Sequence, residues 1–196
     1  RLARGPGGGP LVLPAVAGIL LLLGVAVAHP NGALLAFALL LPAILLGIVS
    51  AVRDLRRPEA RFRAALWCGA AVLTLGLGVL AWNRARPSNR PWAPLMDTAS
   101  AVGQALLANP IIGQPAWLIA FLTVAGLVTF RAPRHAWFLG TTAIAVALWV
   151  VSSSAPEGRV REFLTGIWYS DSYRLGPVLA LVALPFAALA LERAAA

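Results

Sequence analysis

The sequence predicts an all-α, polytopic membrane protein, and two observations carry this prediction. Hydrophobic residues make up 60% of the 196 positions and charged residues only 12%, which is more apolar than a water-soluble domain can bury. The apolar residues also fall into runs close to the roughly 20 residues that a helix needs to cross a bilayer. We therefore expect about six transmembrane helices and two interfacial helices on the outer face. The predicted spans are residues 11–28, 33–52, 64–82, 116–130, 136–151 and 175–191.

Two segments need a comment on length and composition. The run 116–130 is the shortest, so crossing would require it to extend toward Pro115 or the bilayer to thin locally. Residues 1–10 are rich in Gly and Pro, which is typical of a linker or of a truncated start. We assign residues 11–196 to the helical transmembrane domain.

The distribution of arginines predicts the partner and the orientation. The chain has a net charge of +9, but its arginines lie in short segments between apolar runs, so we expect membrane lipids rather than nucleic acid as the partner. Cytoplasmic loops hold the excess of positive charge, and the arginine-rich loop Arg53–Arg63 therefore predicts that both ends of the segment are cytoplasmic. All 16 basic residues are arginine, which indicates GC-rich coding DNA and a bacterial plasma membrane.

The predicted outer segment 152–174 contains the first interfacial helix. Ser154 and Glu157 have the spacing of a capping box, and a set of apolar residues follows at helical spacing on one face. We expect Arg159 and Arg161 to pair with acidic neighbours at the surface. The apolar set is Val160, Phe163, Leu164 and Ile167.

The predicted outer segment 83–115 contains the second interfacial helix. Asp97, Ser100 and Gln104 share one face of it. Asp97 could be a catalytic or metal-binding carboxylate, or simply a residue at the helix N-terminus. Arg86 and Arg90, in the same segment, could hold a lipid phosphate because guanidinium binds phosphate through two hydrogen bonds.

The richest candidate site is the stretch Trp168–Arg174, directly before the last apolar run. Asp171 could accept a proton from a sugar hydroxyl or hold a divalent metal ion; alternatively, it caps the last helix and pairs with Arg174. Trp168, Tyr169 and Tyr173 could stack on a sugar or a polyprenyl chain, or anchor the helix in the aromatic belt. The sequence leaves these alternatives open, and it indicates no other cofactor.

The absence of other signals narrows the function class. No predicted span has an ionisable residue near its centre, which argues against a proton-coupled transporter or an ion pump. The chain also lacks a Walker loop, HExxH, CxxC and GxSxG, so nucleotide, metalloprotease, thiol-redox and serine-hydrolase chemistry have no support.

Two motifs in the second half of the chain carry a family resemblance. Residues 109–115 read NPIIGQP, and residues 164–174 read LTGIWYSDSYR before a helix of Ala, Leu and Pro. This tail, and its W-Y-x-D-x-x-R pattern above all, resembles the C-terminal half of an uncharacterised actinobacterial family of large multi-pass membrane proteins. That family in turn resembles the GT-C superfamily of polyprenyl-phosphate-sugar-dependent glycosyltransferases.

The resemblance implies that the chain is the membrane portion of a glycosyltransferase at the outer leaflet in cell-envelope glycan assembly. Its partners would be a lipid-linked sugar and the remainder of a longer polypeptide or other envelope-synthesis subunits. The catalytic acid would then lie in an early external loop preceding Arg1, and Asp171 and Arg174 would bind substrate or lipid phosphate or serve the structure. The alternative is a non-enzymatic scaffold or a subunit that translocates a lipid-linked precursor.

Overall fold

The all-α class is confirmed by the computed structural model, which describes residues 17, 18, 20, 24, 29–85, 92–110, 114–131 and 135–195. These residues form seven α-helices, with the short 3-10 helix η2 (Gly166–Trp168) before the last of them. The α-helices are α2 (Pro30–Asp54), α3 (Arg61–Arg84), α4 (Thr98–Leu106), α5 (Trp117–Thr129), α6 (Trp137–Ser154), α7 (Arg159–Thr165) and α8 (Ser172–Ala195).

Four of these helices, α2, α3, α6 and α8, are long and apolar enough to cross a membrane. Each corresponds to a predicted span. The helix predicted at 116–130 forms as α5, but its 13 residues rise only about 20 Å, less than the roughly 30 Å of a hydrocarbon core. The predicted linker 1–10 and almost all of the predicted span 11–28 lie outside the described residues.

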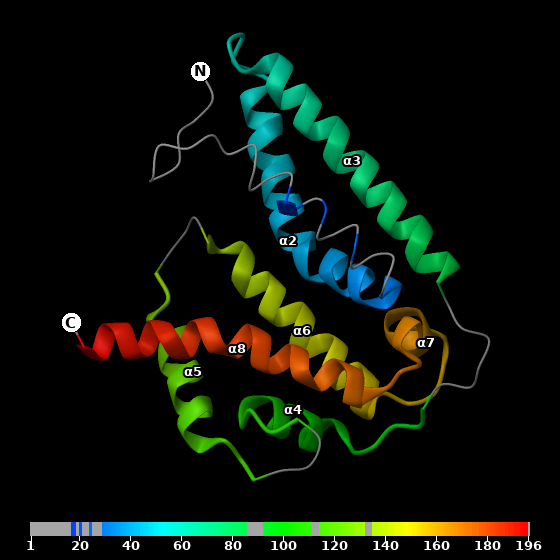
Figure 1. Cartoon of the computed structure of the whole chain (residues 1–196), viewed down its shortest axis with the longest axis vertical. Helices are drawn as coiled ribbons and strands as arrows, with labels where there is room; N and C mark the ends of the chain where they lie inside the picture. The colour runs from blue at the N-terminus through cyan, green and yellow to red at the C-terminus, as the bar shows by residue number, and fades with distance from the viewer. Residues whose placement is uncertain are drawn as a thin grey trace.

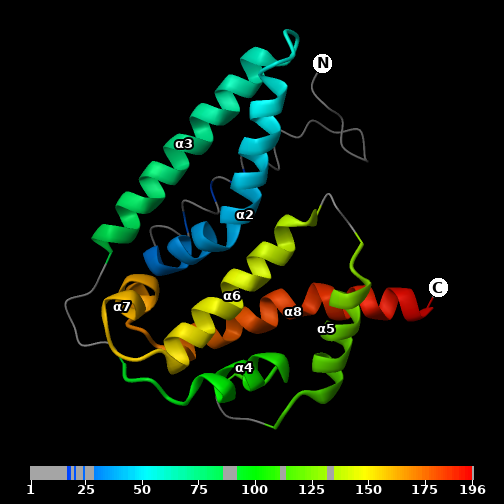
Figure 2. The ribbon, with the colours of Figure 1, turned by 180° about the vertical axis from the view of Figure 1, so that it is seen from behind.

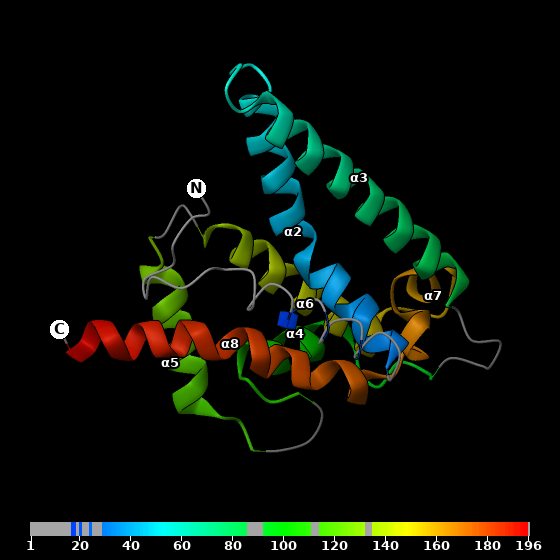
Figure 3. The ribbon, with the colours of Figure 1, turned by 45° about the horizontal axis from the view of Figure 1, so that its top comes forward.

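The helices form two parts that meet where α2 packs against α6, and α7 lies at one end of this contact (Figure 1). The hairpin of α2 and α3 is one part; the other consists of α6 and α8 lying together, with α5 and α4 packed against them (Figure 2). From α7 the hairpin leads away from α8, so the two parts diverge toward their far ends (Figure 3). A buried apolar cluster joins them at the near end: Leu34, Ala38, Leu148, Ile167, Trp168 and Leu175.

The crossing of α5 over α8 depends on Gly126. A methyl group on Gly126 would overlap the backbone carbonyl of Phe186, so only glycine allows this approach. Close backbone contact through small residues is a common way to pack helices in membranes, where no hydrophobic effect draws them together.

The first predicted interfacial helix differs from the observed α7. Ser154 is the last residue of α6 and its hydroxyl donates to the carbonyl of Val150 (2.8 Å), so the predicted capping box is wrong: the serine is used by its own helix. α7 begins at Arg159. Of the predicted apolar face, Val160 is 72% exposed and Ile167 is buried in η2, whereas Arg161 is only 2% exposed.

The second predicted helix forms as α4. Asp97 is its N-cap, and its Oδ1 accepts a hydrogen bond from the backbone N–H of Ser100 (2.9 Å). The interpretation of Asp97 as a residue at the helix N-terminus is therefore confirmed. α4 is held against α6 by the indole of Trp149, which donates to the carbonyl of Ala101 (3.1 Å). Trp149 is fully buried.

Candidate functional site

Arg161 is the centre of the polar network at the α7 end. Its Nη2 donates to the carbonyl of Ser152 (2.7 Å) in the last turn of α6 and to that of Ser170 (3.3 Å) before α8. A cation at the C-terminus of a helix interacts favourably with the exposed carbonyls and the helix dipole. The predicted surface pairing of Arg161 is therefore wrong: this side chain ties α7 to the end of α6 and the start of α8.

The environment of Arg161 is unusual for a charged group. None of the seven acidic residues of the chain, all within the described ranges, forms an ion pair with it. Burial lowers the pKa of the Arg161 guanidinium, and the charge of Glu157 acts in the opposite direction. Because an arginine remains protonated in proteins, Arg161 is a buried cation that depends on carbonyl oxygens for its stabilisation.

The turn that receives Arg161 has a left-handed backbone. Tyr169 and Ser170 have φ values of 61° and 53°, which for residues other than glycine costs roughly 1–2 kcal/mol each. The turn directs two carbonyls to donors: that of Ser170 accepts from Arg161, and that of Tyr169 accepts from the backbone N–H of Trp92 (2.8 Å). These contacts offset the strain and connect the turn to the segment before α4.

Asp171 and Arg174 interact as an i, i+3 pair at the start of α8. Oδ1 of Asp171 accepts from the backbone N–H of Tyr173 (2.8 Å), and Oδ2 accepts from Nε of Arg174 (3.2 Å). Capping and pairing by Asp171 are therefore confirmed. The guanidinium of Arg174 also lies 4.9 Å from the ring centroid of Tyr169, which is cation–π distance. In the described part of the chain no acceptor engages its Nη1 or Nη2.

Trp168 is part of the core rather than of an aromatic belt or an open stacking platform. It is 3% exposed, and its indole N–H donates to the carbonyl of Asn31 at the start of α2 (3.0 Å). Its ring meets that of Trp82 edge to face, with centroids 5.5 Å apart. Trp82 in turn donates to the carbonyl of Phe163 (2.9 Å), so the two tryptophans connect α2, α3, α7 and η2.

A small pocket of mixed polar and apolar lining opens beside Trp168. It has a volume of about 300 Å³, and Arg174 is the cation that lines it. The remaining lining residues are His29, Pro30, Asn31, Gly32, Leu35 and Trp168. We call this the Arg174 pocket. Tyr173 does not line it; its ring is 47% exposed and lies 6.4 Å from that of Trp92.

An apolar groove lies between the two parts of the fold. Its volume is about 360 Å³ and it is bounded by α2, α3, α6 and α7. The lining residues are almost all hydrocarbon: Phe37, Ala38, Leu41, Leu75, Val79, Trp82, Asn83, Ile144, Ala147, Leu148, Val151, Phe163 and Leu164. Trp82 lines this groove and Trp168 lines the Arg174 pocket. The two rings, which are in contact, therefore lie between the groove and the pocket.

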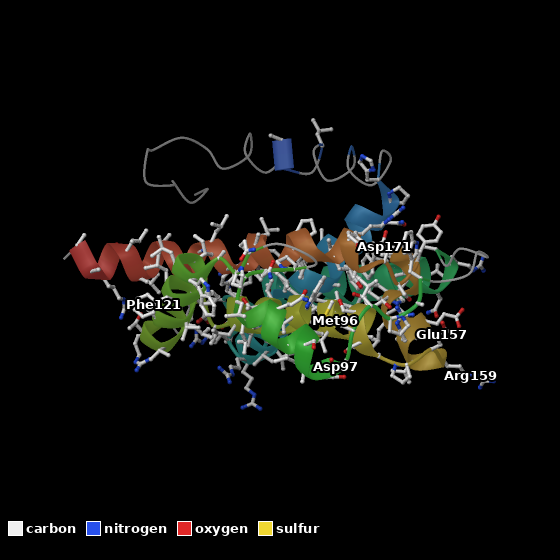
Figure 4. All side chains as sticks on the ribbon, turned by 90° about the horizontal axis from the view of Figure 1, so that it is seen from below. Met96, Asp97, Phe121, Glu157, Arg159 and Asp171 are labelled. Carbon is white, nitrogen blue, oxygen red and sulfur yellow. The ribbon has the colours of Figure 1, made fainter. Side chains whose placement is uncertain are left out.

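The remaining predicted candidates lie elsewhere. Asp97 is on a different face of the molecule from Asp171 (Figure 4), and hydrogen bonds from the Ser100 hydroxyl and backbone N–H lower the pKa of its carboxyl. Arg86 and Arg90 lie outside the described residues. Among the described side chains, no group of three or more His, Cys, Asp or Glu is placed to hold a metal ion.

Four apolar helices that are long enough to cross a membrane define the class: a multi-pass helical membrane protein. The chain belongs to the DUF6541 family, a family of unknown function whose model matches residues 1–196. Neither the curated proteins nor the solved structures contain a significant match.

Proposed function

We propose that this chain is the membrane portion of a GT-C-like glycosyltransferase acting at the outer leaflet, and that its α7 end binds a polyprenyl-phosphate sugar. In this proposal the chain has six spans, its two ends are cytoplasmic and the α7 end faces outward. The tail motif W-Y-x-D-x-x-R supports the family assignment.

The observation that carries the proposal is that the apolar groove and the Arg174 pocket lie next to each other, with the paired rings of Trp82 and Trp168 between them. A polyprenyl-phosphate sugar has a long hydrocarbon chain, one phosphate and a polar sugar. The groove offers hydrocarbon walls for the chain, and Nη1 and Nη2 of Arg174 can donate to two phosphate oxygens. Asp171 and Tyr169 would hold the guanidinium in place, while His29 and Asn31 offer polar groups to the sugar.

A second candidate function has its own support. Among the residues that the structure describes, no acid lines either the groove or the Arg174 pocket, and both oxygens of Asp171 are engaged. A general base would therefore have to come from other sequence or another subunit. This favours a non-enzymatic subunit that holds, or helps to translocate, the lipid-linked precursor.

Binding of a radiolabelled polyprenyl-phosphate sugar to the reconstituted protein tests the shared part of both candidates. We expect Arg174→Gln and Ala147→Phe to weaken binding at least about tenfold, because the first removes a charge-assisted contact and the second fills the groove. The matched controls are Arg159→Gln and Ala143→Phe, because both residues are exposed and line neither the groove nor the Arg174 pocket. Equal binding by all four variants would overturn the proposal.

Glycan analysis of cells that carry Arg174→Gln separates the two candidates. Loss of the glycan with the lipid-linked sugar accumulating on the outer leaflet is expected of a transferase. Retention of that sugar on the inner leaflet is expected of a translocation subunit.

A further inference from the structure

A second basic cavity lies at the opposite end of the bundle, where α5 and α8 end and α6 begins. Its volume is about 330 Å³. Four ionisable residues line it: Arg131, His135, Glu192 and Arg193. Two arginines against one acid give the cavity a positive charge.

The floor of this cavity is aromatic and firmly packed. Phe186 is 1% exposed, and its ring centroid lies 5.7 Å from that of Phe130 and 5.2 Å from that of Phe138. The close crossing at Gly126 holds the backbone of α5 against Phe186. The floor is thus a preformed hydrocarbon surface.

The rim is positioned by the ends of α5 and α8. Nη1 of Arg131 donates to the carbonyls of Val128 (2.8 Å) and Phe130 (3.1 Å), which caps α5 and fixes the guanidinium. Arg193 lies in the last turn of α8. From Phe186 to Arg193 the helix rises about 10 Å. Over this distance the lining of the cavity changes from hydrocarbon to cations. The same distance separates the headgroup of a phospholipid from the first part of its acyl chain.

We propose that this cavity binds an anionic phospholipid of the adjacent leaflet. The phosphate lies between Arg131 and Arg193, His135 donates to the headgroup, and the upper acyl chain packs on Phe138 and Leu189, which line the cavity and are half-buried. Basic pockets between membrane helices are a recognised way to bind acidic headgroups, and the aromatic floor distinguishes a lipid from a free anion. The proposal is independent of the proposed function, because it concerns the other end of the molecule.

Native mass spectrometry of the whole chain, released from nanodiscs of mixed phosphatidylglycerol and phosphatidylcholine, tests this site. The expected result is retention of one phosphatidylglycerol in preference to phosphatidylcholine, and a loss of retention of at least about tenfold in Arg131→Gln/Arg193→Gln. The matched control is Arg53→Gln/Arg56→Gln, which removes the same charge from exposed positions in or next to the α2–α3 loop. Ala188→Trp fills the cavity but keeps both arginines, and should also abolish retention.

Three results would overturn the proposal. An equal loss of phosphatidylglycerol retention in both double variants would mean that only the net charge of the protein attracts the lipid. Equal retention of phosphatidylcholine would mean that the arginines do not select the headgroup. Displacement of phosphatidylglycerol by inorganic phosphate, with phosphate retained instead, would assign the cavity to a free anion.

Discussion

Helices α3 and α8 have 24 residues each, and an apolar 18-residue window in each has the same mean hydropathy. The burial of these windows differs: 6% of the window is buried in α3 and 39% in α8. Lipid tails are as apolar as leucine side chains, so hydropathy selects the membrane over water but not protein over lipid. The difference between the helices therefore comes from what they pack against.

α8 packs against α5 and α6 along a continuous stripe, in which small residues such as Gly176, Ala183 and Ala187 alternate with Val and Leu. α3 buries only Ala64 among its residues and packs chiefly on α2. Trp82 also connects it to the other part, through its hydrogen bond to Phe163 and its ring contact with Trp168. α8 is thus the centre of the protein core, and α3 is one wall of the apolar groove.

Arg161→Ala should have the largest effect on the α8 side. It removes a charged donor from two buried carbonyls, those of Ser152 and Ser170, and each such bond contributes about 1.5–3 kcal/mol. We expect a loss of about 3 kcal/mol in the free energy of unfolding, measured by denaturant titration in mixed micelles. Arg159→Ala, exposed on the same helix, should stay within about 0.5 kcal/mol of the wild type. Similar losses in the two variants would mean that Arg161 is not a structural connection.

Gly126→Ala, in α5 where it crosses α8, and Gly69→Ala, in α3, compare the packing of α8 with that of α3, and we expect changes of opposite sign in the free energy of unfolding. The methyl group at Gly126 would overlap the carbonyl of Phe186 and separate α5 from α8, costing about 1–3 kcal/mol. On α3 a Cβ at Gly69 meets nothing within 4 Å, so alanine should raise stability by up to about 1 kcal/mol through helix propensity. The same unfolding assay decides, and a stabilised Gly126→Ala would refute the close crossing.

Trp82→Phe should loosen α3 without disturbing α8. The substitution keeps an aromatic ring beside Trp168 but removes the donor to Phe163, at a cost of about 1 kcal/mol. Hydrogen exchange should increase in α3 and α7 and remain unchanged in α8. Increased exchange throughout the chain would contradict the separation into two parts.

Asp97→Asn should give the smallest effect, and one that depends on pH. Because hydrogen bonds from Ser100 lower the folded-state pKa below the ordinary value of 3.8, the charged carboxyl stabilises the folded state above that value, and this contribution is lost as the pH falls through the folded-state pKa. The difference in Tm between wild type and variant should therefore shrink between about pH 6 and pH 3. A Tm difference between wild type and variant that grows on acidification would contradict the expected direction of the pH dependence.

Local features of this chain could be predicted and tertiary ones could not. The helix predicted at 175–191 is α8, and the Asp171–Arg174 pair forms as expected, since hydropathy runs and i, i+3 spacing are read from neighbouring residues. Arg161 was predicted at the surface because Glu157 and Glu162 are near it in sequence. Its burial depends on carbonyls of α6 and of a left-handed turn, and no residue type in that turn predicts the conformation.

The same limit applied to the apolar groove and the Arg174 pocket. The groove brings together residues from α2, α3, α6 and α7, which are up to about 130 positions apart, so no local pattern could reveal it. The sequence did single out Arg174, because a charged residue beside an apolar run is conspicuous. Its binding role stays a prediction.

Photo-crosslinking from α3 tests most directly whether the apolar groove binds a polyprenyl lipid. A benzophenone side chain is placed either at Leu75, which lines the groove, or at Leu73, which is 62% exposed and outside it, in membranes that contain radiolabelled polyprenyl phosphate. We expect a labelled adduct at Leu75 that excess unlabelled polyprenyl phosphate removes, and only weak labelling at Leu73 that it does not remove. Equal, non-competed labelling at both positions would show that α3 meets only bulk lipid and that the groove is not a binding site.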